Sequence, residues 1–439
     1  MARGDDATRR VHAIGGAIAA RVSIPGSKSL SNRHLVLAAL SHGASELRGV
    51  LASDDCDMLR AALSQLGARF EAKDDAWLVD GVTGNPRGGG SIDLGHGGTP
   101  TRFMLAVAAL CEDETLVDGS DRMRERPVDE GIDLLVALGA KARFPRKAGA
   151  LPVAIHGPLT EPAVTVYRTA SSQFVSALML VAPCTENGIA IRFAEHPTSA
   201  SYLELSIEAL CRVGVHAQVE RHEGGELSCV SIAPQMIPAH SVLIEPDASS
   251  AVYFGALAAL VGGSIEIPRL DLQSSQPDLF FFRDLQARGV EVVAQGGSES
   301  GVLIRVPRGT VLRAHDSDYS SAPDAAVMAM LLAACGDAPS LFTGLSTLRV
   351  KESDRIETVA AGLRALGGSV DVGSDWARVH PLPRRLTPAV IQSANDHRLA
   401  MAFGVLGCAR EGVSIAEPSV VSKSWPRFWD ALREATLLG

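Results

Sequence analysis

Several signals of covalent and metal chemistry are missing from this sequence. Its seven cysteines are scattered at positions 56, 111, 184, 211, 229, 335 and 408 with no CxxC pair, so neither a disulfide framework nor a zinc site is expected. There is no HExxH and no GxSxG motif, and the segment GSKS lacks the GxxxxGK[ST] spacing of a nucleotide-binding P-loop. We therefore expect no metal and no cofactor, and a chemistry that depends on positioning, electrostatics and proton transfer.

Long apolar runs and an excess of basic residues are also missing. The longest apolar stretches, such as AAVMAMLLAAC at 325–335, are well short of the ~20 residues that span a bilayer. The first ten residues, MARGDDATRR, lack the apolar core of a secretory signal. The net charge is −9, which argues against a sequence-independent nucleic-acid binder. We expect a cytoplasmic protein with reduced thiols and with neither nucleic acid nor membrane as partner.

What the sequence does contain is a sixfold repeat. An apolar, helix-forming segment recurs as LVLAAL (35–40), LAVAAL (105–110), ALMLVA (177–182), GALAAL (255–260), AMLLAA (329–334) and AFGVLG (402–407). The steps between these segments are 70, 72, 78, 74 and 73 residues, so the repeat accounts for nearly all of the 439 residues. Because these segments are apolar nearly all round, we expect six buried helices.

Each repeat continues with a second, amphipathic helix that stops at a Gly and leads into a strand, as in IETVAAGLRALGGSVDV at 356–372. The last repeat ends in WPRFWDALREATLLG with no strand after it, whereas a β-like segment, VHAIGGAIAARVSI (11–24), precedes the first repeat. We predict that this segment completes the C-terminal half. The domains would then be 24–245 and 1–23 plus 246–439.

Cations stand at or near the starts of four of the six buried helices, where the helix dipole is already positive. They are Lys28, Arg33, Arg102, Arg168, His397 and Arg398. The other two starts carry Asp247 and Asp324. Free N–H groups at helix starts bind anions, and the segment RVKESDR (349–355) adds carboxylates among further cations. The residues alone predict a site between two domains for a polyanionic small molecule, with carboxylates available for proton transfer.

Nine motifs follow one another in a familiar order: PGSKSLSNR, LGHGGTPTR, RMRERP, ASSQF, PDASSA, PDAA, RVKESDR, NDHR and SKSWPRF. From about residue 20 to its end, the chain resembles the 5-enolpyruvylshikimate-3-phosphate synthase family. The resemblance implies an α/β fold of two similar domains, each of three βαβαββ repeats forming an inside-out α/β barrel, with the active site in the interdomain cleft. It also implies transfer of the enolpyruvyl group of phosphoenolpyruvate to the 5-hydroxyl of shikimate 3-phosphate, with release of phosphate, in chorismate and aromatic amino acid biosynthesis.

The resemblance assigns a role to individual residues. Shikimate 3-phosphate would be held by Lys28, Ser29, Arg33, Ser171, Ser172, Gln173, Ser199, Tyr202, Asp324 and Lys351. Phosphoenolpyruvate would be held by Lys28, Gly98, Arg126, Gln173, Arg355, Arg398 and Lys423. The catalytic residues would be Asp324, which accepts the hydroxyl proton, and Glu352 with Lys28, which handle the proton at the methylene carbon. The N-terminal domain would take the shikimate 3-phosphate side and the C-terminal domain the acid–base and phosphoenolpyruvate side of a monomeric enzyme.

Four residues depart from the family pattern: His96, Pro100, Thr101 and Thr347. We expect them to affect affinity rather than the reaction. Gly98 leaves room for a phosphonate analogue, so we expect the protein to be a target of glyphosate.

Two alternatives are less consistent with the residues. The related enolpyruvyl transferase that acts on UDP-N-acetylglucosamine carries a Cys five residues before an Arg-Pro pair, whereas Asp121 stands at that distance from Arg126-Pro127. A non-catalytic homologue that only binds phosphorylated ligands would have lost the acid–base residues, yet Asp324, Glu352 and Lys28 are all present.

Overall fold

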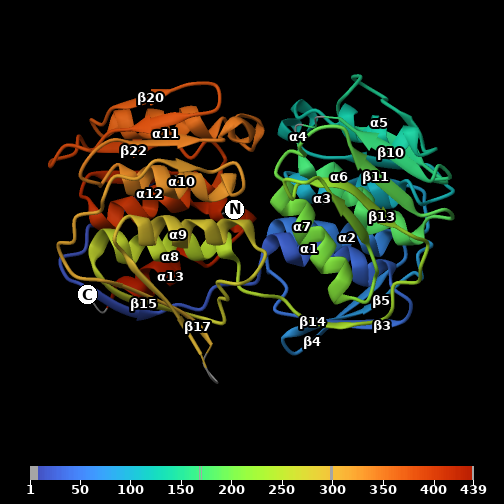
Figure 1. The fold of residues 1–439 in the computed structure, drawn as a ribbon, viewed down its shortest axis with the longest axis horizontal. Helices are drawn as coiled ribbons and strands as arrows, with labels where there is room; N and C mark the ends of the chain where they lie inside the picture. Colours follow the sequence, from blue (N-terminus) through green and yellow to red (C-terminus); the bar gives the residue numbers. More distant parts are fainter. Residues whose placement is uncertain (1–7, 168, 170, 297–299, 438–439) are drawn as a thin grey trace, which may run out of the picture. The chain divides into compact units, whose positions relative to one another are not determined.

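The computed structural model describes residues 8–167, 169, 171–296 and 300–437. The chain forms two compact units, shown in Figure 1. The first unit is Gly26–Ile244, and the second unit is Met1–Pro25 together with Glu245–Gly439. Each unit contains three of the six repeats, so the chain enters the first unit after residue 25 and leaves it at residue 244.

The first unit contains three repeats of helices and strands. Its helices are α1 (Lys28–Leu40), α2 (Asp54–Gln65), α3 (Gly98–Ala108), α4 (Asp121–Glu125), α5 (Asp129–Ala137), α6 (Ser172–Val181), the 3₁₀ helix η1 (Ala182–Cys184) and α7 (Ala200–Arg212). Its strands are β3 (Ala44–Arg48), β4 (Arg69–Lys73), β5 (Ala76–Asp80), β6 (Ser91–Asp93), β7 (Thr115–Asp118), β8 (Lys141–Arg143), β9 (Val153–His156), β10 (Ala163–Val166), β11 (Ile189–Phe193), β12 (Gln218–Arg221), β13 (Leu227–Ile232) and β14 (Ser241–Leu243).

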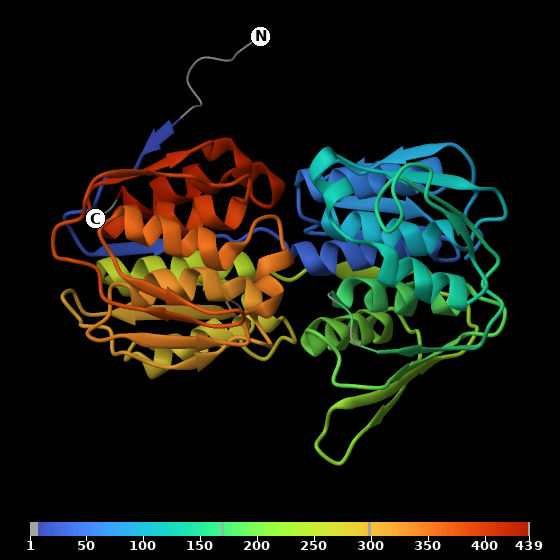
Figure 2. The same ribbon diagram turned by 90° about the horizontal axis from the view of Figure 1, so that it is seen from above.

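The second unit repeats the same plan. Its helices are α8 (Ala248–Val261), η2 (Pro277–Leu279), α9 (Phe280–Ala287), α10 (Pro323–Ala333), η3 (Ser346–Val350), α11 (Arg355–Ala365), α12 (His397–Ala409), η4 (Pro418–Lys423) and α13 (Phe428–Thr436). Its strands are β1 (Thr8–Arg10), β2 (Ile18–Arg21), β15 (Gly263–Pro268), β16 (Glu291–Gln295), β17 (Gly301–Val306), β18 (Ser317–Asp318), β19 (Ser340–Thr343), β20 (Val370–Val372), β21 (Ala377–Val379), β22 (Ala389–Ile391) and β23 (Val413–Ala416). Figure 2 shows both units from a second direction.

The sheets share one pattern of pairing. In the sheet β10-β11-β13-β12, the first two strands are parallel, and β11, β13 and β12 pair antiparallel. The parallel pair requires a crossover helix, here α6, and the outer helix α7 leads back to the antiparallel hairpin. This is the βαβαββ order that the family resemblance implies. The described strands form six separate sheets, none of them closed into a barrel.

Segments distant in the sequence complete three of the sheets. Strand β14, at the end of the first unit, pairs parallel with β3 of the first repeat. The N-terminal strand β2 pairs parallel with β15, and β1 pairs antiparallel with β23 in a three-stranded sheet. The β-like segment expected at 11–24 does join the second unit, but it contains one strand only, Ile18–Arg21, and the strand Thr8–Arg10 lies outside it. The chain bends between them at Gly15-Gly16, which favours a turn over a continuous strand.

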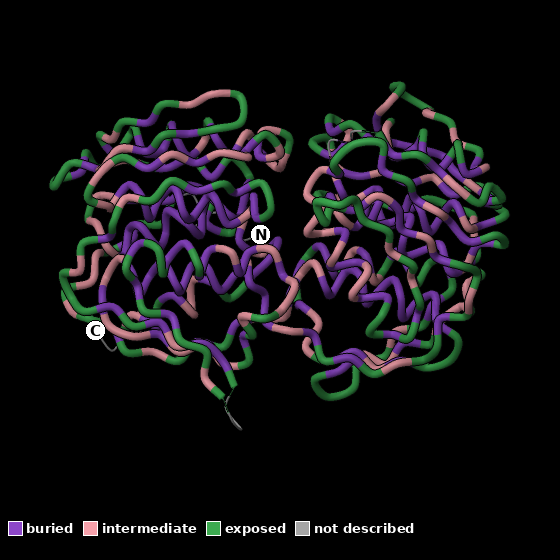
Figure 3. Tube along the Cα trace, in the orientation of Figure 1, coloured by how far each residue is buried: buried purple, intermediate pink, exposed green. Residues whose placement is uncertain are grey.

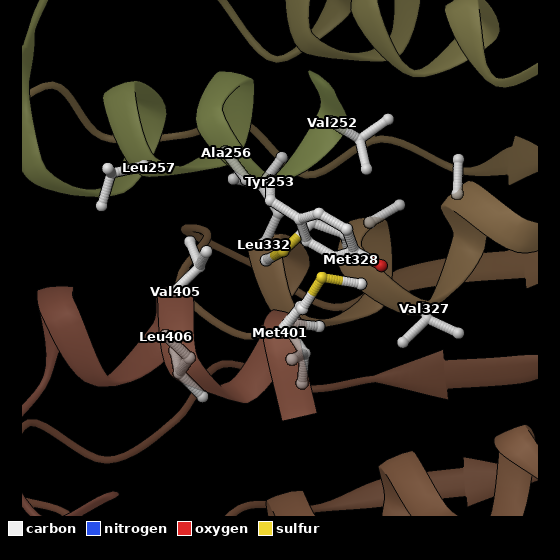
Figure 4. Packing of buried hydrophobic residues seen from close by; sticks show 14 of the residues in the cluster. Val252, Tyr253, Ala256, Leu257, Val327, Met328, Leu332, Met401, Val405 and Leu406 are labelled. Carbon is white, nitrogen blue, oxygen red and sulfur yellow. The ribbon is translucent and has the colours of Figure 1, made fainter. Parts of the chain in front are cut away.

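The first helix of each repeat is buried, as its composition predicts. In the second unit, α8, α10 and α12 pack against one another, and Figure 4 shows Tyr253, Met328 and Met401 meeting between them. Every residue of α10 except Asp324 is buried. In Figure 3 the buried colour follows these inner helices, whereas the exposed colour follows the outer strands and loops. Asp324, in the first turn of α10, is thus the one residue of this helix that is partly exposed.

None of the helices in the described part of the chain combines the length and the apolar composition needed to cross a bilayer.

Candidate functional site

The second unit gathers seven charged residues at or just before the starts of α10, α11 and α12 and at the end of η4, which we call the Arg355 cluster. Its members are Asp324, Lys351, Glu352, Arg355, Asp396, Arg398 and Lys423. Arg355, with only 1% of its side chain exposed, lies at the centre. Its guanidinium donates to Asp324 at 2.6 Å, to Glu352 at 2.7 Å and to Asp396 at 2.7 Å. One buried cation thus holds three carboxylates in fixed positions, and these carboxylates come from different parts of the chain.

Asp324 is held by three cations. Besides Arg355, it accepts a hydrogen bond from Arg398 at 2.8 Å, and Lys351 Nζ lies 3.6 Å away. Burial alone would raise the pKa of Asp324, but the charges of Arg398, Lys351 and Arg355 outweigh it and hold that pKa well below 3.8. Asp324 is therefore ionised at neutral pH, and it can accept a hydrogen bond from a hydroxyl group.

Glu352 lies between two cations. Its carboxylate contacts Arg355 at 2.7 Å and Lys423 Nζ at 3.1 Å. Both cations favour the ionised carboxylate. Lys351, the preceding residue, has its pKa lowered below 10.5, chiefly by burial and against the attraction of Asp324. The cluster therefore combines carboxylates, cations and one lysine whose charge is made less favourable by its surroundings.

Asp396 is a member that the sequence reasoning missed. Its carboxylate is fully buried, caps α12 by accepting from the backbone N–H of Arg398 at 3.0 Å, and contacts Arg355. An Asp directly before an apolar helix is a typical N-cap, and this signal in NDHR could have identified it. Its pairing with Arg355, 41 residues away, could not be read from the sequence.

A further buried carboxylate, Asp278 of η2, lies beside this cluster. It accepts a short hydrogen bond from Ser249, while its other oxygen, Oδ1, has no hydrogen-bond partner among the described residues. Burial first, and then the negative charge of Asp324, raise the pKa of Asp278 from 3.8 to about 6. This pKa has a consequence for stability.

We expect Asp278→Asn to stabilise the protein at pH 8 but not at pH 4. A carboxyl group with a native pKa of about 6 and an unfolded pKa near 3.8 favours folding below pH 4, and this contribution is lost as the pH rises through 6. Above both pKa values, the free energy of unfolding is lower by roughly 3 kcal/mol than it would be without this shift. Denaturant unfolding of the variant and of the native protein at pH 4 and pH 8 measures the difference in their free energies of unfolding. The exposed Asp113→Asn is the control, and an equal effect of both variants at pH 8 would contradict the expectation.

In the first unit, Lys28 stands at the first position of α1. Its Nζ lies 3.2 Å from Oδ2 of Asp55, a buried carboxylate in the first turn of α2. This pairing offsets part of the repulsion between the lysine and the positive end of α1. Asp55 was not predicted, because its neighbour Lys28 lies 27 residues away in the sequence.

Three residues predicted to hold phosphoenolpyruvate meet at the starts of α3 and α6. The guanidinium of Arg126 is so close to Gly98 that a Cβ at this glycine would lie 2.6 Å from Nη1 of the arginine. Arg102 donates to the carbonyl of Gly98 and to Oε1 of Gln173, both at 3.1 Å. Gln173 donates in turn to Thr99 at 2.9 Å. Arg102 was noticed as a helix-start cation but not placed in the site.

Arg33 has many contacts within the protein. Its guanidinium donates to the hydroxyls of Ser206 and Ser176 and to the carbonyls of Ser29 and Tyr202, at 2.9–3.1 Å. The side chain is buried, and burial lowers its pKa to about 10, which leaves it charged at neutral pH. Arg33 thus ties α1 to α6 and α7. This arrangement suits a residue that positions its neighbours, and direct binding of substrate by Arg33 stays a prediction.

The remaining predicted residues lie at the starts of α6 and α7. Ser171 caps α6, its Oγ accepting from the backbone N–H of Gln173 at 3.3 Å, and Ser172 is buried at the first helical position. Ser199 precedes α7 with φ of +50°, a strained left-handed conformation for a serine. Arg168, which the sequence placed beside the start of α6, lies outside the described residues.

The departures from the family pattern occupy two places. His96 and Ser120 share a hydrogen bond of 2.9 Å on the surface of the first unit, while Pro100 and Thr101 are buried in the first turns of α3. Thr347 lies in η3, with its hydroxyl buried and without a hydrogen-bond partner in the described part of the chain. Within the same part, no group of three or more His, Cys, Asp or Glu residues is placed to hold a metal ion.

The chain is similar to known proteins over nearly its whole length. Residues 13–432 match the family model of EPSP synthase (3-phosphoshikimate 1-carboxyvinyltransferase). It is 37% identical to a 3-phosphoshikimate 1-carboxyvinyltransferase of Methanosphaerula palustris, with 94% of this chain and 96% of that relative covered. A protein of the same name from a Janthinobacterium species is 34% identical, with 94% and 95% covered.

The fold is similar to that of solved structures. An EPSP synthase from Acinetobacter baumannii superposes with a TM-score of 0.81 at 22% identity, with 98% of each chain covered. The family match, the full-length relatives and this fold agree, and the nine motifs lie within the matched residues. The chain therefore belongs to the EPSP synthase (3-phosphoshikimate 1-carboxyvinyltransferase) family.

Proposed function

We propose that this protein transfers the enolpyruvyl group of phosphoenolpyruvate to the 5-hydroxyl of shikimate 3-phosphate and releases phosphate. The observation that carries this proposal is the Arg355 cluster, in which an ionised Asp324 is held among three cations. A reaction between two phosphorylated carboxylates needs such cations to offset their mutual repulsion and a carboxylate to receive a hydroxyl proton. Family membership supports the same reaction.

The first unit contributes the groups that bind shikimate 3-phosphate. Lys28 and the serines at the starts of α1, α6 and α7 offer an ammonium group, hydroxyls and helix-start N–H groups to a phosphate. Gln173 and Tyr202 add polar contacts for the ring hydroxyls, and Arg33 keeps these helix starts in register. Asp324 and Lys351 of the second unit are further candidate ligands of shikimate 3-phosphate.

Phosphoenolpyruvate needs cations for its phosphate and its carboxylate, and each unit carries candidates for this role. In the first unit, the candidate ligands of the phosphate and carboxylate groups are Arg126 beside Gly98, together with Lys28 and Gln173. In the second unit, the candidate ligands of the same groups are Arg355, Arg398 and Lys423. Guanidinium forks bind such oxyanions in a fixed orientation, which places the enol carbon for attack.

Proton transfer follows from the charges around the two carboxylates. The methylene carbon of phosphoenolpyruvate gains a proton, and the 5-hydroxyl oxygen bonds to the neighbouring carbon while Asp324 takes the hydroxyl proton. The tetrahedral intermediate then loses phosphate, and the methyl group gives up a proton to regenerate the double bond. Glu352 and Lys28 handle the proton at this carbon.

Glu352 needs a change in its surroundings to act as an acid, because Arg355 and Lys423 favour its ionised form. Binding of an anion to Lys423 and Arg355 supplies that change. The anion offsets part of the positive charge that these two cations place beside Glu352. Substrate binding and proton donation are thereby coupled.

We expect Gly98→Ala to raise the KM for phosphoenolpyruvate by roughly ten- to a hundredfold, the usual effect of one misplaced methyl group. The added Cβ would lie 2.6 Å from Arg126 Nη1, so the guanidinium must move away. Inhibition by glyphosate, which we expect for the native protein, weakens in the same variant. Steady-state kinetics measure both effects. Gly15→Ala, whose Cβ meets no atom within 4 Å, is the control, and an unchanged KM in Gly98→Ala would count against Arg126 as a ligand.

We also propose that the protein acts in the cytoplasm as a monomer. All seven cysteines are free thiols, which is typical of a reducing compartment. Sedimentation of the purified protein measures its mass in solution and so tests whether it is a monomer.

The experiment that tests the proposed function is phosphate release from phosphoenolpyruvate by the purified protein. The assay is run with shikimate 3-phosphate, with UDP-N-acetylglucosamine and with no acceptor. We expect release only with shikimate 3-phosphate. Release with the nucleotide sugar instead would assign the protein to the other transferase reaction, and release with neither acceptor would leave a binding protein without this activity.

A further inference from the structure

A basic hollow of about 600 Å³ lies on the second unit, apart from the Arg355 cluster. Four arginines from three separate segments line it: Arg10 of β1, Arg384 and Arg385 of the loop before β22, and Arg410 at the end of α12. Glu411 is the one carboxylate in its lining. The hollow therefore has an excess of positive charge in a chain whose net charge is −9.

One side of the hollow is the exposed face of the three-stranded sheet. Arg10 lies opposite Ser414 of β23, and Ser414 lies opposite Val390 of β22, so these three side chains share one face of the sheet. Arg10 and Val390 are exposed, whereas Ile391 and Ile415, on the other face, are buried in the core. The hollow thus joins a cationic wall to a small apolar surface.

Within the described part of the chain, three of these guanidiniums have no carboxylate partner. Arg10, Arg384 and Arg385 have no side-chain ion pair or hydrogen bond to any described residue. Some exposed arginines of the chain are paired, as Arg48 is with Glu46 and Arg143 is with Glu114. One carboxylate, Glu411, offsets only part of this positive charge, so the arginines repel one another and a bound anion would relieve the repulsion.

The remaining charged groups of the hollow are held in place. Arg410 donates to the backbone carbonyls of Pro383 and Arg384, which fixes the loop that carries the neighbouring arginines. Glu411 accepts a hydrogen bond of 3.3 Å from the backbone N–H of Ala13 and so is engaged with the N-terminal segment. The cationic wall is therefore partly preorganised.

The hollow and the Arg355 cluster lie at opposite ends of one helix. Arg398 stands in the first turn of α12, and Arg410 directly follows its last residue. A helical rise of 1.5 Å per residue separates the two by about 18 Å. A molecule in the hollow cannot be part of the same binding site as a ligand of Arg398.

We propose that this hollow binds a phosphorylated small molecule, with its phosphate on the arginines and its organic part on Pro388 and Val390. Four guanidiniums that approach from three segments suit a tetrahedral phosphate, whose oxygens accept from several directions, better than a planar carboxylate. A volume of this size has room for a small organic group besides the phosphate. This site does not depend on the proposed reaction.

The test is calorimetric titration of the full chain with ribose 5-phosphate, inorganic phosphate and citrate. The test variant is Arg384→Gln with Arg385→Gln, and the control is Arg283→Gln with Arg378→Gln, which removes two exposed arginines of the same unit elsewhere. We expect a ribose 5-phosphate site in the native protein and in the control, weakened about tenfold or more in the test variant. The difference between the two variants isolates the hollow from any other anion site.

Three outcomes would overturn the proposal. Equal binding to the native protein and both variants would place the ligand elsewhere, and equal weakening in both variants would indicate a general effect of charge. Citrate bound as tightly as ribose 5-phosphate, with the same loss in the test variant, would exclude a preference for phosphate. Replacing Arg384 and Arg385 by Lys keeps the charge but removes the fork, so we expect an intermediate affinity.

Discussion

Replacing Asp324 with Asn is expected to lower kcat by about 10²- to 10⁴-fold, the usual contribution of a general acid or base. The variant keeps the shape of the side chain but removes the charge that receives the hydroxyl proton. Arg355 retains Glu352 and Asp396 as partners, so the fold should survive. The KM for phosphoenolpyruvate should not rise, because the cations around position 324 become less neutralised.

Steady-state kinetics with both substrates, together with thermal unfolding, check this result. Because the pKa of Asp324 lies well below 3.8, protonation of Asp324 should not limit the activity of the native enzyme between pH 5 and 7. Asp113→Asn, an exposed neutralisation in the first unit, is the matched control and should retain full turnover. A kcat for Asp324→Asn within tenfold of the native value would remove Asp324 from the proposed mechanism.

Replacing Arg355 with Met is expected to lower the free energy of unfolding by about 3–5 kcal/mol, the usual cost of removing one partner from a buried ion pair. Arg355 has 1% of its side chain exposed and contacts three carboxylates, of which Asp396 is fully buried. Without the guanidinium, the carboxylate of Asp396 keeps a backbone N–H and the hydroxyl of Ser353 as hydrogen-bond donors, and no Arg or Lys side chain among the described residues. An uncompensated buried charge therefore remains.

Denaturant unfolding measures this loss, and the chain provides a matched control. Arg349 also pairs with a carboxylate, Asp354 at 2.6 Å, but 27% of its side chain is exposed. Arg349→Met should cost no more than about 1 kcal/mol. Combining Arg355→Met with Asp396→Asn should recover part of the stability, because the buried charge is removed as well. Equal losses for Arg355→Met and Arg349→Met would contradict the central position assigned to Arg355.

The repeats and the inner helices could be predicted from the sequence because they depend on local composition. Apolar segments such as AMLLAA at 329–334 are buried on all sides, and Asp324 is the polar residue that precedes this segment at its helix start. The N-cap at Asp247 could also be predicted, since its carboxylate accepts from the N–H of Ser250 within the same turn. These features follow from a few neighbouring residues.

The partners of the charged residues could not be predicted, because they come from distant repeats. Lys28 meets Asp55 of the next helix, and Arg355 meets Asp396 at the start of α12. Arg33 was predicted as a substrate ligand from its motif alone, whereas its guanidinium contacts serine and carbonyl groups of α6 and α7. A motif shows which cation stands at a helix start. The three-dimensional packing determines which groups of the protein form hydrogen bonds or ion pairs with that cation.

The measurement that tests the account most directly is the mass spectrum of the product formed in D₂O from phosphoenolpyruvate and shikimate 3-phosphate. We expect shikimate 3-phosphate to gain the carboxyvinyl group, with deuterium in its methylene position, because the enol carbon is protonated from solvent before phosphate leaves. The Asp324→Asn variant should form little of this product. Hydrolysis of phosphoenolpyruvate with shikimate 3-phosphate unchanged, or a product free of deuterium, would contradict the proposed transfer by addition and elimination.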